Sequence, residues 1–186
     1  MPRAGLTPEV VVDAALAVID DKGLDALTLA AVASRTGVAA PSLYKHVGGL
    51  TELRSRVAAR VIDEVTQRLS AAIMGRSHDD AVRALMYTYR DYVVEHPGRY
   101  AAITPDALGD PALAAPAAVL LDVFRAVMRG YGLEGSAAIH AIRALRSIAH
   151  GFATIEVSGG FGLPEQLDES YDHLIQMFID SLPGHR

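Results

Sequence analysis

Apolar residues recur at helical spacing along almost the whole chain, and proline, glycine and short polar residues separate the runs. A first helix is predicted where Thr7 can cap the start, Pro8 occupies the first position and Gly23 ends the run. One face of this helix holds its apolar positions, Val11, Ala15, Val18 and Ile19. Because no strand alternation, repeat or low-complexity tract interrupts the periodicity, the pattern predicts an all-α protein.

Two short helices joined by a glycine turn are predicted next. Thr28 can cap a helix that ends near Gly37, and a third helix is expected from Ala40 to Val47. A long fourth helix should begin near Gly49 and continue to about Met74. Two short helices around a tight turn form the outline of a helix-turn-helix, a motif that enters a DNA groove.

The polar segment GRSHDD, residues 75–80, interrupts the apolar periodicity after the fourth helix. Beyond this segment the pattern predicts four more helices, over about 82–95, 110–130, 136–157 and 168–182. We therefore expect a helix-turn-helix domain over residues 1–50, a linking helix over about 50–74 and a larger helical domain over 75–186. A length of 186 residues is also compatible with one large helical domain.

The third helix carries the candidate DNA-reading side chains. At about 100° per residue, an inward-facing apolar pair at Leu43 and Val47 directs the polar side chains of this helix outward. Tyr44 can reach a phosphate with its phenol and a thymine methyl with its ring, and Lys45 can meet a phosphate or a guanine edge. The candidate DNA-binding residues, including the start of the preceding helix, are Thr28, Ala40, Pro41, Ser42, Tyr44, Lys45 and His46. The alternative is a pair of packed helices with a polar outer surface.

The charge distribution restricts where DNA could bind. The formal net charge of −5 argues against a protein that binds nucleic acid over its whole surface. Residues 31–56 nevertheless contain four basic residues and one acidic residue, giving +3, whereas residues 71–186 contain nine basic and fourteen acidic residues, giving −5. DNA contact should therefore be confined to the amino-terminal end.

Composition adds two expectations about surface and compartment. Hydrophobic residues make up 51% of the chain and the mean hydropathy is +0.22, which predicts additional buried surface such as a dimer interface or an apolar pocket. The lack of cysteine excludes disulfides and thiolate metal sites and fits a reducing compartment. Without a signal-peptide core or a membrane-length apolar run, the sequence predicts a soluble cytoplasmic protein with no membrane partner.

The sequence contains no recognisable catalytic motif. It has no H-E-x-x-H, G-x-S-x-G or phosphate-binding loop, and its seven histidines share no i, i+4 spacing that would form a metal-binding face. We therefore expect no enzyme activity, no cofactor and no metal. A ligand-independent architectural or protein-docking helical module is the main alternative to a ligand-responsive DNA-binding protein.

The amino-terminal sequence also resembles a known family. The pattern T-L-x-x-V-A-x-x-x-G-V-x-x-x-S-L-Y-x-H-V, followed by a glycine pair and T-E-L, is similar to the DNA-binding domain of the TetR family of bacterial transcriptional regulators over about residues 7–60. The matching residues are Thr28, Val32, Ala33, Gly37, Val38, Leu43, Tyr44, His46, Val47 and Leu53. Farther along, residues 149–152 (AHGF), followed by Glu156 and Gly160, resemble a subgroup with Trp-His-Gly in its penultimate helix, although alanine replaces the tryptophan.

Two positions depart from the family's pattern. Ala39 stands where the family usually has a serine that caps the recognition helix, a loss of about 1 kcal/mol that Pro41 partly offsets. Leu50 stands where the family usually has a lysine. The loss of this lysine removes one phosphate contact, which predicts weaker nonspecific binding with a shallower salt dependence.

The resemblance implies a homodimeric repressor that binds double-stranded operator DNA. Two recognition helices would read palindromic half-sites roughly 34 to 36 Å apart, and an unknown small-molecule effector in the larger domain would change that spacing. The family's dimer forms mostly from the last two helices, and their excess of apolar residues in this chain agrees with a four-helix interface. The candidate interface residues, for which burial within one chain is the alternative, are Ile148, Phe152, Leu174, Phe178 and Leu182.

The middle helices supply the candidates for a ligand pocket. Aromatic and methionine side chains with a few polar groups suit an apolar pocket that orients its ligand through hydrogen bonds. The candidates are Met86, Tyr89, Tyr92, Tyr100, Phe124, Met128, His140 and Arg143. An ordinary core is the alternative for the apolar members, and Arg143 would either meet an acidic ligand or face solvent.

Overall fold

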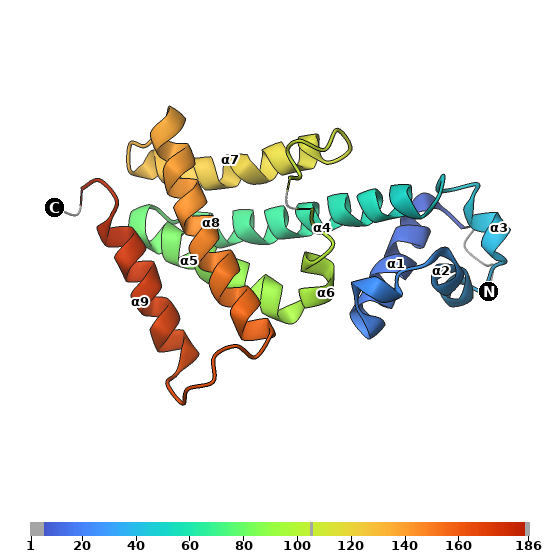
Figure 1. The fold of residues 1–186 in the computed structure, drawn as a ribbon. Helices are drawn as coiled ribbons and strands as arrows, with labels where there is room; N and C mark the ends of the chain where they lie inside the picture. Colours follow the sequence, from blue (N-terminus) through green and yellow to red (C-terminus); the bar gives the residue numbers. More distant parts are fainter. Residues whose placement is uncertain (1–5, 105, 185–186) are drawn as a thin grey trace. The chain divides into compact units, whose positions relative to one another are not determined.

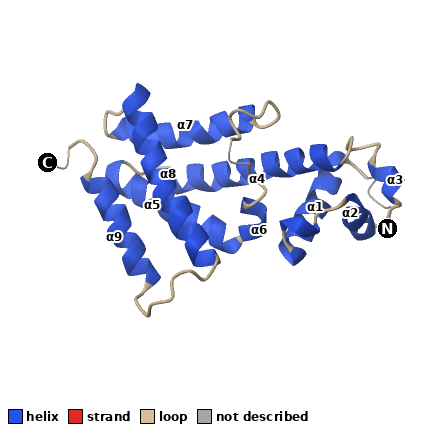
Figure 2. Cartoon of the chain, in the orientation of Figure 1, coloured by secondary structure: helices blue, strands red, loops and turns tan. Residues whose placement is uncertain are grey.

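The computed structural model describes residues 6–104 and 106–184, which form helices and loops and contain no strand (Figures 1 and 2). The prediction of an all-α fold is confirmed. The elements are α1 (Pro8–Lys22), the 3₁₀ turn η1 (Leu24–Ala26), α2 (Leu29–Thr36), α3 (Ala40–Leu43), α4 (Leu50–Ile73), α5 (His78–Glu95), α6 (Pro97–Tyr100), α7 (Ala114–Gly130), α8 (Gly135–Val157) and α9 (Leu167–Asp180). Within the described ranges, no helix combines the length and apolar character needed to cross a membrane.

The chain divides into two compact units. Unit 1 consists of Met1–Ile62 and Gly98–Ala117, and unit 2 consists of Asp63–Pro97 and Ala118–Arg186. The sequence pattern placed residues 98–117 with the carboxyl-terminal helices, whereas the structure groups them with the amino-terminal helices. Helical periodicity does not reveal this grouping, because the grouping depends on contacts between residues far apart in the sequence.

Local sequence signals set the helix ends in unit 1. The Thr7 hydroxyl accepts the Val10 N–H at 3.3 Å at the start of α1. The Thr28 hydroxyl accepts the Ala31 N–H at 3.1 Å at the start of α2, so both predicted caps are confirmed. Gly37 ends α2 with a φ of 70°, a left-handed conformation that glycine adopts without a Cβ clash. The helices α1, α2 and α3 pack around a core that includes Val11, Ala15, Ile19, Leu27, Val32, Leu43, Val47, Leu53 and Val57.

The third helix is shorter than the sequence predicted. It was expected to reach Val47, but α3 ends at Leu43 and residues 44–46 form turns. The His46 N–H bonds to the Leu43 carbonyl at 2.8 Å, an i, i+3 bond that tightens the chain just before the glycine pair. Leu43 and Val47 are both buried, so the predicted inward face of this segment is confirmed.

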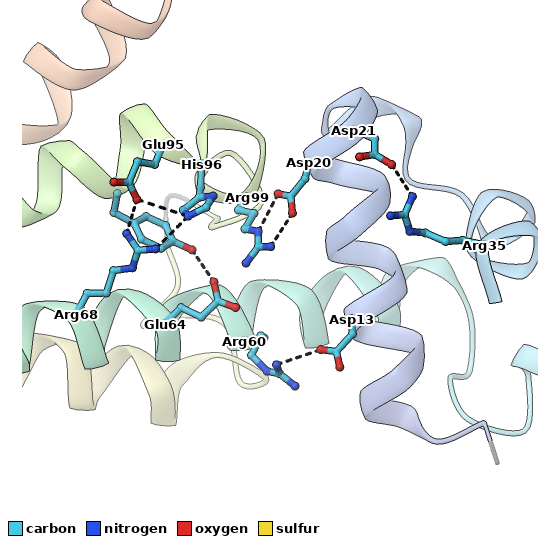
Figure 3. A network of polar contacts seen from close by, with 11 residues as sticks. Asp13, Asp20, Asp21, Arg35, Arg60, Glu64, Arg68, Glu95, His96 and Arg99 are labelled. Carbon is cyan, nitrogen blue, oxygen red and sulfur yellow. Dashed lines mark hydrogen bonds and ion pairs between the residues drawn. The ribbon is translucent and has the colours of Figure 1, made fainter. Parts of the chain in front are cut away.

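Acidic residues of α1 hold other segments of unit 1 by ion pairs (Figure 3). Asp13 pairs with Arg60 of α4 at 3.1 Å, and Asp21 pairs with Arg35 of α2 at 2.5 Å. These pairs join segments that also meet through the apolar core. Because the paired side chains are more than one-third exposed, each pair contributes at most about 1 kcal/mol.

The helix α5 lies at the centre of unit 2 and packs against α8 and α9. Its buried apolar face includes Val82, Leu85, Met86, Tyr89 and Val93. The carboxyl-terminal end of α5 is bonded to α4, because the Tyr92 hydroxyl donates to Glu64 at 3.0 Å and Arg68 pairs with Glu95 at 2.6 Å (Figure 3).

The helix α7 begins later than the sequence predicted. Asp110 was expected to open the helix, but the helix begins at Ala114. The Asp110 carboxylate accepts the Ala112 N–H at 2.9 Å, and its carbonyl accepts the Leu113 N–H at 2.9 Å. A short polar side chain thus holds the local backbone in a turn in place of the first helical turn.

Candidate nucleic-acid interface

The seven candidate DNA-binding residues belong to unit 1, with one at the start of α2 and six on α3 and its following turn. The Tyr44 side chain is 60% exposed, which is unusual for a large aromatic residue without a binding partner. The other six divide by exposure: Thr28, Pro41 and Lys45 are exposed, and Ala40, Ser42 and His46 are half-buried. The structure therefore presents Tyr44 and Lys45 to solvent beside the buried Leu43.

Intrachain ion pairs decide which basic side chains near α3 remain available to phosphates. Arg35 and Arg56 each pair with a carboxylate of unit 1. Lys45 and Arg54 have no carboxylate partner in the part of the chain that the structure describes. Arg54 was counted in the basic segment of the sequence but was not expected at the site. Glu52 and Arg56 stand four residues apart on one helix, a spacing that favours an ion pair between them. This spacing was the sequence signal that Glu52 would pair with Arg56 and leave Arg54 without a carboxylate partner.

The turn after α3, residues 44–46, is called the recognition turn, and Glu52 holds its junction with α4. Its Oε2 accepts the Gly48 N–H at 2.7 Å, and its Oε1 accepts the Arg56 Nε–H at 2.8 Å. The Gly48 N–H and the Arg56 guanidinium lower the pKa of Glu52. The carboxylate therefore keeps its charge to a lower pH than an ordinary glutamate does.

The candidate ligand residues do not form one group in the structure. Tyr100 belongs to unit 1, whereas the other candidates belong to unit 2. His140 and Arg143 are exposed on α8, and Tyr92 is bonded to Glu64. The five buried candidates are Met86, Tyr89, Tyr92, Phe124 and Met128.

Two cavities of unit 2 are lined by residues other than these candidates. The first, of about 660 Å³, lies at the start of α5 and the end of α7 and is lined by Ser77, His78, Asp79, Asp80, Gly130, Tyr131, Pro183 and Gly184. The second, of about 420 Å³, lies in the loop between α8 and α9 and is lined by Gly160, Phe161, Gly162, Leu163, Glu165, Leu167 and Ser170. A pocket role for the eight candidate ligand residues stays a prediction.

The candidate dimer residues divide by burial. Phe152, Phe178 and Leu182 are 4–6% exposed and already lie in the core of one chain. Ile148 and Leu174 are half-buried. Other apolar side chains are more accessible on the same two helices, with exposed fractions of 44% for Ile155, 44% for Val157 and 68% for Met177. The apolar pattern did not single out these residues, although Met177 stands three positions after Leu174, on the same helix face.

A buried arginine at the centre of unit 2 was also missed. Arg90 of α5 is bidentate to Glu156 of α8, at 2.6 and 2.8 Å, and contacts Asp168 of α9 at 2.7 Å. Its guanidinium carbon lies 5.3 Å from the Phe152 ring centroid and 5.2 Å from that of Tyr171. Hydrogen bonds to Glu156 raise the pKa of Arg90, so it carries a permanent charge. The signal was a charged residue within an otherwise apolar helix face.

Comparisons with known proteins agree with the geometry. Residues 11–54 match the model of the tetR family of bacterial regulatory proteins, and residues 82–178 match a tetracyclin repressor-like carboxyl-terminal domain.

The uncharacterised HTH-type transcriptional regulator Rv0681 of Mycobacterium tuberculosis is 40% identical over 158 residues, which are 84% of this chain and 72% of that protein. The uncharacterised HTH-type transcriptional regulator YobS of Bacillus subtilis is 33% identical over 182 residues, 97% of this chain and 95% of that protein. A solved structure of a Rhodococcus protein of unknown function shares the fold, with a TM-score of 0.79 at 20% identity over 96% of each chain.

The helix-turn-helix of unit 1 and the matched carboxyl-terminal domain define a DNA-binding transcriptional regulator. The chain belongs to the TetR family, whose members are transcriptional regulators and not enzymes. Membership of the Trp-His-Gly subgroup stays a prediction.

Proposed function

We propose that this regulator is a cytoplasmic, homodimeric repressor that leaves a palindromic operator when a small molecule binds. The observation that carries the proposal is the exposed pair Tyr44 and Lys45 on the turn after α3, held in place by the buried Leu43 and Val47. Residues 1–50 act as the DNA-binding domain, and residues 75–186 act as the ligand-binding and dimerisation domain, with α4 between them in sequence.

Each proposed DNA contact follows from side-chain chemistry. Tyr44 reads a thymine methyl or donates to a phosphate, and Lys45 contacts a phosphate or a guanine edge. The Thr28 hydroxyl accepts the Ala31 N–H and keeps its own proton for a phosphate oxygen. Arg54 adds a phosphate contact where Leu50 offers none. Ala40, Pro41, Ser42 and His46 complete the proposed surface.

Dimerisation through α8 and α9 is supported by their accessible apolar side chains. Ile155 and Met177 are 44% and 68% exposed, and Ile148 and Leu174 are half-buried beside them in helical spacing. A second copy of the same helices would cover these side chains in a symmetric four-helix contact. Phe152, Phe178 and Leu182 support that contact from beneath, as core residues of each protomer.

In vitro selection from random duplex DNA tests the proposed function. We expect a palindrome whose half-sites are about one helical turn apart, because two recognition segments of a symmetric dimer read identical sequences. A salt titration with the selected duplex should give a linear decrease of log affinity with log salt concentration. Failure to enrich any sequence at low salt would instead support the architectural or protein-docking module.

The contacts of the segment around α6 support a mechanism for the proposed response to the effector. Asp20 of α1 pairs with Arg99 of α6 through two bonds of 2.8 and 2.6 Å (Figure 3). The two backbones are also close, because a Cβ at Gly98 would lie 3.1 Å from the carbonyl oxygen of Ile19. The chain runs directly from α5 into α6, so a ligand that changes the end of α5 would act on a segment anchored to α1.

Arg99→Ala should release this anchor. Hydrogen exchange at the amides of residues 98–103 should become about fivefold faster, because a half-buried, bidentate pair contributes about 1 kcal/mol to local stability. Mass spectrometry of the deuterated protein measures the change. The matched control is Arg125→Ala, which removes an exposed pair with Asp122 on α7 and should leave residues 98–103 unaffected. Equal exchange in both variants would show that the Arg99 pair does not anchor α6.

A further inference from the structure

The segment between the recognition turn and α4 is built from two glycines flanked by buried residues. Val47 is 2% exposed and Leu53 is fully buried, so both ends of the segment are fixed by the core of unit 1. Gly49 has a φ of 150°, in the region that side chains rarely adopt. A Cβ at Gly48 would lie 2.8 Å from Oε2 of Glu52, so a larger residue at this position would force the end of the glutamate side chain to shift.

The Glu52 carboxylate bonds to both sides of this segment. It is the third residue of α4, from which a glutamate can reach back to an N–H that precedes the helix. One oxygen accepts the Gly48 N–H at 2.7 Å, and the other accepts the Arg56 Nε–H at 2.8 Å. A single side chain therefore links the end of the recognition turn to the first two turns of α4.

We propose that Glu52 is a positioning residue for DNA recognition, which fixes the turn that carries Tyr44 and Lys45 against the start of α4. The role rests on the proposed DNA-binding function. Leu43 and Val47 hold the recognition turn on the core, but α3 is one turn long and Ala39 gives it no side-chain cap. The Glu52 bond is therefore the side-chain hydrogen bond that joins this turn to α4. Without the Gly48 bond, the two flexible glycines would let the recognition turn and the start of α4 shift against each other into arrangements that do not fit a groove, and ordering them would cost binding free energy.

A purely electrostatic role for Glu52 predicts the opposite result. Segment 31–56 contains four basic residues and one acidic residue, which is Glu52. A carboxylate close to DNA repels phosphates and neutralises Arg56, so its removal would strengthen binding in proportion to the charge removed. Glutamine and alanine remove the same charge, but only glutamine keeps an oxygen that can accept the Gly48 N–H. The two substitutions therefore separate positioning from charge.

The test compares Glu52→Ala and Glu52→Gln in the full chain. Fluorescence anisotropy measures the dissociation constant for the duplex selected by the wild-type protein and for an unrelated duplex, at several salt concentrations. We expect Glu52→Ala to weaken binding to the selected duplex roughly tenfold, comparable with the loss of a helix cap. Glu52→Gln should bind at least as tightly as the wild type. Asp25→Ala, which removes an exposed carboxylate from η1, is the control for net charge and should bind as the wild type does.

Gly48→Ala gives a second, independent variant. The added Cβ would displace the Glu52 oxygen, so this variant should reproduce the loss seen for Glu52→Ala. The double variant Gly48→Ala/Glu52→Ala should bind no worse than the weaker single variant, because both changes remove the same bond. Circular dichroism should show unchanged helix content in every variant.

The outcomes separate the proposed positioning role of Glu52 from the proposed DNA-binding function. If Glu52→Ala binds the selected duplex as tightly as Glu52→Gln, the positioning role is overturned while the proposed DNA-binding function stands. If the wild-type protein enriches no duplex, both are overturned. If the loss in Glu52→Ala is equal for the selected and unrelated duplexes, the residue supports DNA binding without regard to sequence and the positioning role is again wrong.

Discussion

Replacing Tyr44 and Lys45 together with alanine should lower the affinity for the selected operator by about 100-fold or more. A good side-chain contact to a base edge contributes about 1 to 3 kcal/mol, and the double variant removes two such side chains from each copy of the chain. Folding should be unaffected, because Tyr44 is 60% exposed and Lys45 is also exposed. Substitutions at such surface positions usually change the free energy of unfolding by less than about 0.5 kcal/mol.

Single variants separate the two contributions. Lys45→Ala should weaken binding to all duplexes and reduce the slope of log affinity against log salt by about one unit per bound protomer. Tyr44→Ala should mainly reduce the difference between selected and unrelated duplexes. Lys22→Ala, an exposed lysine in the last turn of α1, is the control. An unchanged operator affinity in the double variant would mean that another surface reads the DNA.

Arg90→Ala should destabilise the folded protein by about 3 kcal/mol. The substitution removes the two hydrogen bonds that compensate for the burial of the Glu156 carboxylate, whose side chain is 17% exposed. The carboxylate then remains largely buried without the guanidinium that neutralises it. It also removes the cation that stacks on Phe152 and Tyr171. The bond to Asp168 adds little to this loss, because that side chain is 79% exposed.

Chemical denaturation at a fixed protein concentration measures the effect of Arg90→Ala, since dimerisation would make the apparent stability depend on concentration. Arg90→Met in combination with Glu156→Gln removes the buried charges while keeping volume, so this double variant should be more stable than Arg90→Ala. Arg83→Ala offers a comparison on the same helix, because Arg83 pairs with Asp172 at 3.7 Å and is 36% exposed. A loss below about 1 kcal/mol for Arg90→Ala would show that solvent replaces the arginine without cost.

Signals that act over a few residues could be read directly from the sequence. Thr7 and Thr28 cap their helices as predicted, because a threonine hydroxyl needs only an N–H three residues ahead. Gly37 ends α2 because glycine tolerates the left-handed conformation required there. The burial of Leu43 and Val47 also followed from spacing, since one face of a short helix must meet the core.

Other features could not be read from the apolar spacing. The sequence extended the recognition helix to Val47, but bonds within residues 42–47 and the anchored glycine segment end it at Leu43. Periodicity also marked Phe152 and Phe178 as apolar without showing which partner covers them. In the structure their own chain does so, and the accessible side chains are those of residues such as Met177.

The sequence by itself determined the all-α class, the capped helices of the amino-terminal end and the resemblance that placed the chain in its family. These depend on hydrogen-bond donors, turn conformations and apolar spacing within a few residues of one another. Only the tertiary structure decided that Arg99 anchors on Asp20 and that Arg90 joins α5 to α8. The physical reason is that an ion pair or a hydrogen bond depends on how the chain brings two groups within about 3 Å, and a linear pattern of residue types does not contain that distance.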